Sequence, residues 1–210
     1  MAPLLCSAYL PPISHFLAMY GQETVFIEAY DRYRKQTYRN RCLIAAANGV
    51  QALTIPVVKP EPGQLMRDIR ISSHGDWKHQ HWNALASAYM NSPFFMYYQD
   101  DFRHIFEKEH TFLLDFNMEL TETLLDLTGL KTALCLTDRY NKEVPQDLRH
   151  LINTDSTGTP STEEYYQVFA QKNGFRQGLS MVDLLFNMGP ESILVLKRAN
   201  GLQDGLRSNP

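Results

Sequence analysis

Short strand-like segments fill the first third of this sequence, and amphipathic helical segments fill its middle. Runs rich in aliphatic, β-branched and aromatic residues are typical of strands and cover residues 4–10, 24–30, 41–47, 50–58 and 65–72, with a later run at 131–137. Asn48-Gly49 lies between two of these runs, and both residue types tolerate a positive φ, which favours a hairpin turn. The first third therefore supplies most of the strands of the predicted sheet.

Apolar residues recur at helical spacing in the rest of the chain. This pattern predicts helices over residues 13–20, 76–90, 94–109, 112–128, 180–188 and 191–199. Ser92-Pro93 is typical of a helix start, and Gly129 is typical of a helix end. Strands followed by helices and one more strand predict an α/β (mixed α+β) fold, in which a mixed β-sheet from the N-terminal third is covered by helices from the middle and C-terminal parts.

Length and composition narrow the class of protein. A chain of 210 residues fits a single domain over residues 1–210, with a frayed tail at 200–210. No apolar run approaches the ~18 residues of a membrane span, and the N-terminus does not resemble a secretory signal. Three cysteines argue against a disulfide framework and for a reducing, cytoplasmic location. The net charge of −3 disfavours a nucleic-acid binder.

The charge is unevenly distributed, because residues 31–41 read DRYRKQTYRNR. This window holds five cations and one acid, so the rest of the chain carries a net charge of −7. Arginine forks recognise phosphate and carboxylate groups, and we expect Lys35, Arg39, Asn40 and Arg41 to bind such an anion. The alternative is a solvated edge strand whose charges prevent aggregation.

Two titratable residues are candidates for a general base. Glu28 precedes the basic window and either removes a proton from a substrate or pairs with the neighbouring cations. His81 shares a helix face with Trp77 and Leu85, where it is either a neutral base or a hydrogen-bonded core residue.

Two further polar residues are candidates for substrate binding. Asn117 lies on the apolar stripe of its helix and either braces a neighbouring loop or contacts a ligand. Asp183 has capping-box spacing from Ser180, which gives it a structural alternative to substrate binding. Cys42 adjoins the basic window, where cations would lower its pKa. No sequence motif for a metal site is present, and we expect no metal.

Motifs along most of the chain resemble the WbqC-like protein family. These motifs are Tyr9-Leu10-Pro11-Pro12 with His15-Phe16, Tyr38-Arg39-Asn40-Arg41, Asn48-Gly49 before Ile55-Pro56-Val57, Trp77 with His81-Trp82, Ser92-Pro93-Phe94-Phe95, and Leu179-Ser180 with Asp183 to Asn187. Family members often have an Asp-Asp pair where this chain has Glu28 and Ala29.

The resemblance implies a bacterial protein of cell-surface polysaccharide biosynthesis. It suggests an N-acyl- or aminoacyl-transferase that acts on an amino-sugar precursor, with an acyl-carrier or coenzyme A thioester as donor and no required cofactor. In that reaction His81 or Glu28 would remove the amine proton. The alternative is a non-catalytic protein of the same pathway, which would bind a phosphorylated small molecule or dock an acyl carrier protein.

Overall fold

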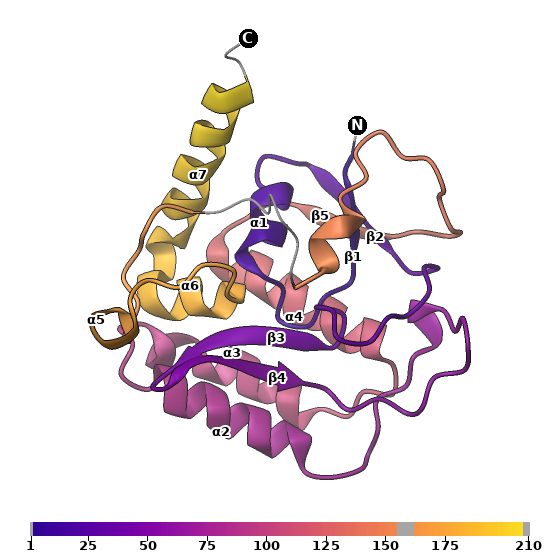
Figure 1. Ribbon diagram of the computed structural model, residues 1–210, viewed down its shortest axis with the longest axis horizontal. Coiled ribbons are helices and arrows are strands. Elements are labelled where there is room, and N and C mark those ends of the chain that lie inside the picture. The colour runs from indigo at the N-terminus through magenta and orange to yellow at the C-terminus, as the bar shows by residue number, and fades with distance from the viewer. Residues whose placement is uncertain (1, 155–161, 208–210) are drawn as a thin grey trace.

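The computed structural model describes residues 2–154 and 162–207 and contains two small sheets surrounded by helices (Figure 1). Strands β1 (Leu4–Cys6), β2 (Thr24–Glu28) and β5 (Ala133–Leu136) form a parallel sheet in the order β1-β2-β5. Strands β3 (Arg41–Ala46) and β4 (Gly49–Thr54) form a separate antiparallel hairpin. The predicted α/β class is confirmed, and its strands are divided between these two sheets.

The helices match the apolar periodicity of the sequence closely. The longer ones are α1 (Ile13–Met19), α2 (Trp77–Tyr89), α3 (Phe95–Glu107), α4 (Leu113–Thr128), α6 (Met181–Met188) and α7 (Ser192–Arg207). Short helical turns are α5 (Ala170–Asn173), η1 (Met66–Asp68), η2 (Arg149–Ile152) and η3 (Gly189–Glu191). As expected, α4 ends at Gly129, whose φ of 73° is left-handed.

Helix α6 lies at the centre of the core. It packs against α1, α2, α3, α4, α7 and β3, and seven of its eight residues are buried. A helix with apolar residues on most of its sides must be enclosed by its neighbours, and its two polar residues, Asp183 and Asn187, are buried and hydrogen-bonded. Figure 1 shows α6 beside the β3–β4 hairpin, while the parallel sheet and its loops lie on the other side of α1.

The parallel sheet places three chain segments at one edge. A parallel connection needs a crossover, and α1 supplies it between β1 and β2. The long connection from β2 to β5 contains the hairpin and three helices, and it returns the chain parallel to β2. The residues after Cys6, Glu28 and Leu136 therefore meet at the carboxyl edge of this sheet.

The structure corrects one predicted strand. Residues 65–72 do not form a strand; they contain the turn η1, flanked by single bridges from Leu65 to Arg32 and from Ile71 to Val57. Met66 and Ile69 are both buried, and their three-residue separation suits one helical turn better than a strand. The apolar alternation of this segment therefore reflects isolated contacts.

Several predicted boundaries are shifted. The strand predicted over residues 4–10 ends at Cys6, and the strand predicted over residues 50–58 ends at Thr54. The predicted hairpin is confirmed. Ala46 pairs with Gly49, so the turn is centred on Ala47 and Asn48 and not on Asn48 and Gly49. Of the predicted pair, only Gly49 has a positive φ. Helix α7 continues to Arg207, past the predicted helix end at residue 199, so residues 200–207 are helical where a frayed tail was expected. The last part of that predicted tail, 208–210, lies outside the described residues.

Candidate functional site

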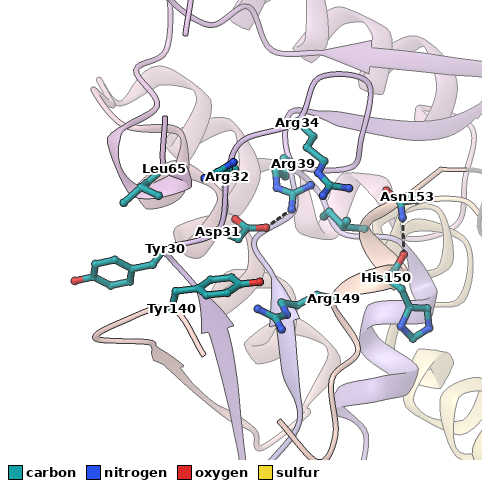
Figure 2. A pocket seen from close by; sticks show the side chains of 11 residues that line it. Tyr30, Asp31, Arg32, Arg34, Arg39, Leu65, Tyr140, Arg149, His150 and Asn153 are labelled. Carbon is teal, nitrogen blue, oxygen red and sulfur yellow. Dashed lines mark hydrogen bonds and ion pairs between the residues drawn. The ribbon is translucent and has the colours of Figure 1, made fainter. Parts of the chain in front are cut away.

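A pocket of about 600 Å³ opens at the carboxyl edge of the parallel sheet (Figure 2). Its lining comes from the segment after β2, from the loop after β5 and from η2, with Leu65 at one side. Open α/β sheets commonly bind ligands at the carboxyl ends of their strands. Four arginines line the pocket, namely Arg32, Arg34, Arg39 and Arg149.

Arg39 forms the buried floor of this pocket. Its side chain is 4% exposed and is ion-paired with Asp31, which also lines the pocket. Its Nη1 donates to Thr37 Oγ1 at 3.3 Å, and its Nη2 lies 3.3 Å from Cys6 Sγ. Arg39 Nε and Asp31 Oδ1 are buried and make no hydrogen bond in the described part of the chain. One donor and one acceptor at the floor thus have unused hydrogen-bonding capacity.

Arg149 reaches the same pocket from η2. Its Nη2 lies 2.5 Å from Asp147 Oδ2, its Nε lies 2.9 Å from Asp147 Oδ1, and its Nη1 lies 3.3 Å from Glu28 Oε2. The hydrogen bonds to Asp147 raise the pKa of Arg149 and lower that of Asp147. The guanidinium also lies 5.0 Å from the centre of the Tyr140 ring. Two carboxylates and one ring therefore fix its position.

Arg32 and Arg34 differ from these two because they are exposed and form no ion pair with any described residue. Figure 2 shows the guanidinium group of Arg34 close to that of Arg39, on the far side of Asp31 from Tyr140. Arg39 is balanced by Asp31, whereas Arg149 is paired with two carboxylates, Asp147 and Glu28. Together with Arg32 and Arg34, this group of four arginines and three carboxylates has a net charge of +1, which a bound anion would neutralise.

Glu28, a predicted base, lies behind the pocket wall and does not line the pocket. Its side chain is fully buried and accepts hydrogen bonds from Thr137 Oγ1 at 2.8 Å and from the Tyr30 amide at 3.0 Å. The Asn141 amide, at 3.4 Å, and Arg149 are its other donors. These contacts tie β2, the loop after β5 and η2 together, so the observed role of Glu28 is to position Arg149.

His81, the other predicted base, lies in the core and does not line this pocket. Its Nδ1 is 2.9 Å from the Tyr9 hydroxyl, and its ring makes an edge contact with Trp77. Burial lowers the pKa of His81 to about 4, so the imidazole is neutral at neutral pH. Its surroundings match the alternative interpretation of a hydrogen-bonded core residue.

The other predicted binding residues are divided between the pocket and its supports. Lys35 is exposed and outside the lining, while Arg41 donates to Thr54 Oγ1 at 3.2 Å on the β3–β4 hairpin. Asn40 donates to the Ile55 carbonyl at 2.9 Å, again away from the pocket. Asn117 donates to the Arg39 carbonyl at 2.8 Å and to Ser7 Oγ at 3.0 Å. Asn117 therefore braces the loop that carries Arg39, one of its two predicted roles.

Asp183 belongs to a separate hydrogen-bond network in the core. Ser180 caps α6, as predicted, but the capping-box interpretation is wrong because Asp183 accepts from the hydroxyls of Tyr89, at 2.8 Å, and Tyr165, at 2.7 Å. Gln167 Nε2 is a third donor at 3.0 Å. Burial raises the pKa of Asp183 to about 6. This carboxylate joins α2, α6 and the segment before α5, and it does not line the pocket.

Four pocket residues escaped the sequence analysis, and one expectation about a cysteine is wrong. Arg149 and Tyr140 come from the segment 138–152, which lacks clear periodicity, and Arg32 and Arg34 were not singled out within the basic window. Burial raises the pKa of Cys42, whereas the neighbouring cations were expected to lower it. Among residues 2–154 and 162–207, no cluster of His, Cys, Asp and Glu side chains has the arrangement of a metal site.

Comparison with known proteins identifies the family of this chain. The model of the WbqC-like protein family matches residues 7–158, which is more than half of the chain. The chain belongs to the WbqC-like family. It is also 27% identical to the uncharacterized protein Rv1507c of Mycobacterium tuberculosis (strain ATCC 25618 / H37Rv), over 89% of this chain and 93% of that protein. No solved structure matches it significantly.

The family match covers the whole basic window and all segments that line the pocket. In the described part of this WbqC-like chain, every helix falls short of the length or apolar character needed to cross a membrane.

Proposed function

We propose that this WbqC-like protein binds a phosphorylated precursor of a cell-surface glycan in the arginine-lined pocket. Membership of the family suggests a role related to glycan biosynthesis. The finer part of the proposal is that the protein transfers an acyl or aminoacyl group to the amine of an amino sugar. The donor is a thioester of coenzyme A or of an acyl carrier.

The observation that carries the proposal is the convergence of four arginines on one concave site. Three come from the basic window, and Arg149 comes from a segment more than a hundred residues later. Arginine recognises phosphate oxygens through paired hydrogen bonds. A pocket of about 600 Å³ encloses a small molecule, whereas a surface that docks a carrier protein would present its cations on an open face. This shape favours a small phosphorylated ligand over the alternative docking function.

The proposed transfer needs one group that accepts a proton. The amine nitrogen attacks the thioester carbonyl, a C–N bond forms, the C–S bond breaks, and the thiolate leaves. The amine gives up one proton to a base, and the thiolate takes one proton to become a thiol. Asp31 is the carboxylate among the residues that line the pocket, so we assign the base role to Asp31.

Calorimetric titration with inorganic pyrophosphate tests the binding part of this proposal. Arg34→Ala removes an unpaired cation of the pocket, and Lys35→Ala removes the adjacent cation outside it. A hydrogen bond to a charged group contributes about 1.5–3 kcal/mol, so we expect Arg34→Ala to weaken binding by about 10- to 150-fold. Lys35→Ala should change the Kd by less than about twofold, because exposed charges contribute little. Equal losses in both variants, or no binding by the wild type, would contradict the proposal.

A further inference from the structure

We infer that the pocket takes a nucleoside diphosphate group, with the diphosphate on the arginines and the base on Tyr140. This inference rests on the proposed function, because it identifies which phosphorylated compound the same site binds. Two sources share this chemistry. A nucleotide sugar carries it on the acceptor side of the reaction, and coenzyme A carries an adenosine diphosphate on the donor side.

The arrangement of charge fits a diphosphate. Arg39 and Arg149 are already ion-paired, whereas Arg32 and Arg34 have no partner among the described residues. Arg32 and Arg34 provide one unpaired guanidinium for each of the two negative charges of a diphosphate that is esterified at both ends, and the four arginines and three carboxylates around the pocket have a net charge of +1. Asp31 lies between Arg39 and Tyr140 in Figure 2, so Arg34 and Arg39 lie at the end of the pocket away from the ring, and Arg149 lies beside the ring. The ligand therefore needs both a charged part and an uncharged, flat part.

Tyr140 is suited to hold that flat part. Its side chain lines the pocket, is 54% exposed, and is held by the Arg149 guanidinium 5.0 Å from the ring centre. In Figure 2 its hydroxyl end points toward Asp31 and Arg149, while the Tyr30 ring points away from them. The Tyr30 hydroxyl is engaged by Arg67 at 2.6 Å. Exposed aromatic rings beside cations are common platforms for stacked bases.

The size of the pocket also favours a ligand larger than a sugar monophosphate. About 600 Å³ lies within the range of sites that enclose cofactor-sized molecules. A single phosphate and one sugar ring would occupy only the end of the pocket near Arg34 and Arg39. The nucleoside extends the ligand toward Tyr140 and fills the remainder.

The test compares four probes by calorimetric titration of the full chain: uridine 5′-diphosphate, adenosine 5′-diphosphate, inorganic pyrophosphate and uridine. We expect at least one nucleoside diphosphate to bind about tenfold or more tightly than pyrophosphate, and uridine alone to bind weakly. Stacking on an aromatic ring contributes about 1–3 kcal/mol per base. Tyr140→Ala should therefore weaken binding of the nucleoside diphosphate by about 5- to 150-fold. Preference for the uridine compound indicates the nucleotide-sugar source, and preference for the adenosine compound indicates coenzyme A.

Three controls separate stacking from other effects. Tyr140→Phe keeps the ring and should bind like the wild type. Tyr97→Ala removes an exposed ring outside the pocket and should change the Kd by less than about twofold. Tyr140→Ala should leave pyrophosphate binding within about twofold. If pyrophosphate binds as tightly as both nucleotides, or if Tyr140→Ala weakens pyrophosphate equally, this inference is overturned while the proposed anion site stands. If the wild type binds none of the phosphorylated probes, the proposed function fails as well.

Discussion

The pocket and the core each contain a group of enclosed polar side chains, and the two groups use their charges differently. In the pocket, Arg32 and Arg34 lack partners among the described residues and lie open to solvent. In the core, Asp183 accepts three hydrogen bonds and His81 contacts Tyr9. Burial favours the neutral form of both core groups: it raises the pKa of Asp183 to about 6 and lowers the pKa of His81 to about 4. Exposed cations without an ion-pair partner therefore distinguish the pocket from the hydrogen-bonded groups around Asp183 and His81.

Arg39 belongs to both regions, and its loss should have the largest effect. Arg39→Ala leaves the carboxylate of Asp31 enclosed without its partner, and breaking a buried ion pair in this way costs about 3–5 kcal/mol. We expect urea denaturation to show a loss of that size in the free energy of unfolding. The double variant Asp31→Ala with Arg39→Ala should be more stable than Arg39→Ala alone. A loss below about 1 kcal/mol for the single variant would show that the pair is solvated.

The next largest effect is the pH dependence that His81 contributes to stability. Its folded pKa of about 4 lies below the ordinary value of 6.5, so the folded state binds fewer protons than the unfolded state between these values. This contribution is fully present above pH 6.5 and is lost as the pH falls toward 4.

The size of that loss is about 3 kcal/mol, since one pKa unit corresponds to about 1.4 kcal/mol. Denaturation at pH 7 and pH 4 should show that wild type loses about this much more stability than His81→Gln. His15, whose pKa burial also lowers to about 4, is present in both proteins, so its effect cancels in the comparison. Equal losses in the two proteins would mean that water reaches the His81 ring.

A smaller loss of stability is expected when either of the two carboxylates that hold Arg149 is replaced, and the loss should differ between them. Glu28 is fully buried with four donors, whereas the Asp147 side chain is 37% exposed. Glu28→Gln should lower the free energy of unfolding by about 1–3 kcal/mol, because an amide nitrogen cannot accept the hydrogen bonds that the carboxylate accepts. Asp147→Asn should cost less than about 1 kcal/mol, as exposed ion pairs do. The reverse order in urea denaturation would contradict the burial argument.

The smallest expected effect is the change in ligand affinity when a core residue, His81, is replaced. At pH 7, His81→Gln should change the Kd for pyrophosphate by less than about twofold, because His81 does not line the pocket. Calorimetric titration alongside Arg34→Ala provides the comparison. A tenfold loss in the histidine variant would couple the core to the pocket and revive a direct role for His81.

Local patterns in the sequence were sufficient for most helices and for the hairpin. Helical spacing of buried residues located α2, α3 and α4 within about two residues at each end, because each helix buries one continuous face. Residues 65–72 were wrongly predicted as a strand. They form the turn η1, and isolated backbone bridges pair them with Arg32 and Val57, which lie elsewhere in the sequence. Non-local contacts override weak local alternation.

The candidate site was less accessible to sequence analysis. The basic window contains Arg39, which lines the pocket, but the window also contains a turn in which Gln36 adopts a φ of 59°. Lys35 and Arg41 point elsewhere, although they have the same charge as Arg34. Arg149 and Tyr140 reach the pocket only because β5 pairs with β2, and no local pattern encodes that pairing.

The most direct test of the central claim is a crystal structure of the protein with a bound nucleoside diphosphate, uridine 5′-diphosphate or adenosine 5′-diphosphate. The account predicts that the phosphates lie within hydrogen-bond distance of Arg34 and Arg39, with the base against Tyr140. Phosphates bound instead at Lys35 and Arg41, or beside His81, would contradict it.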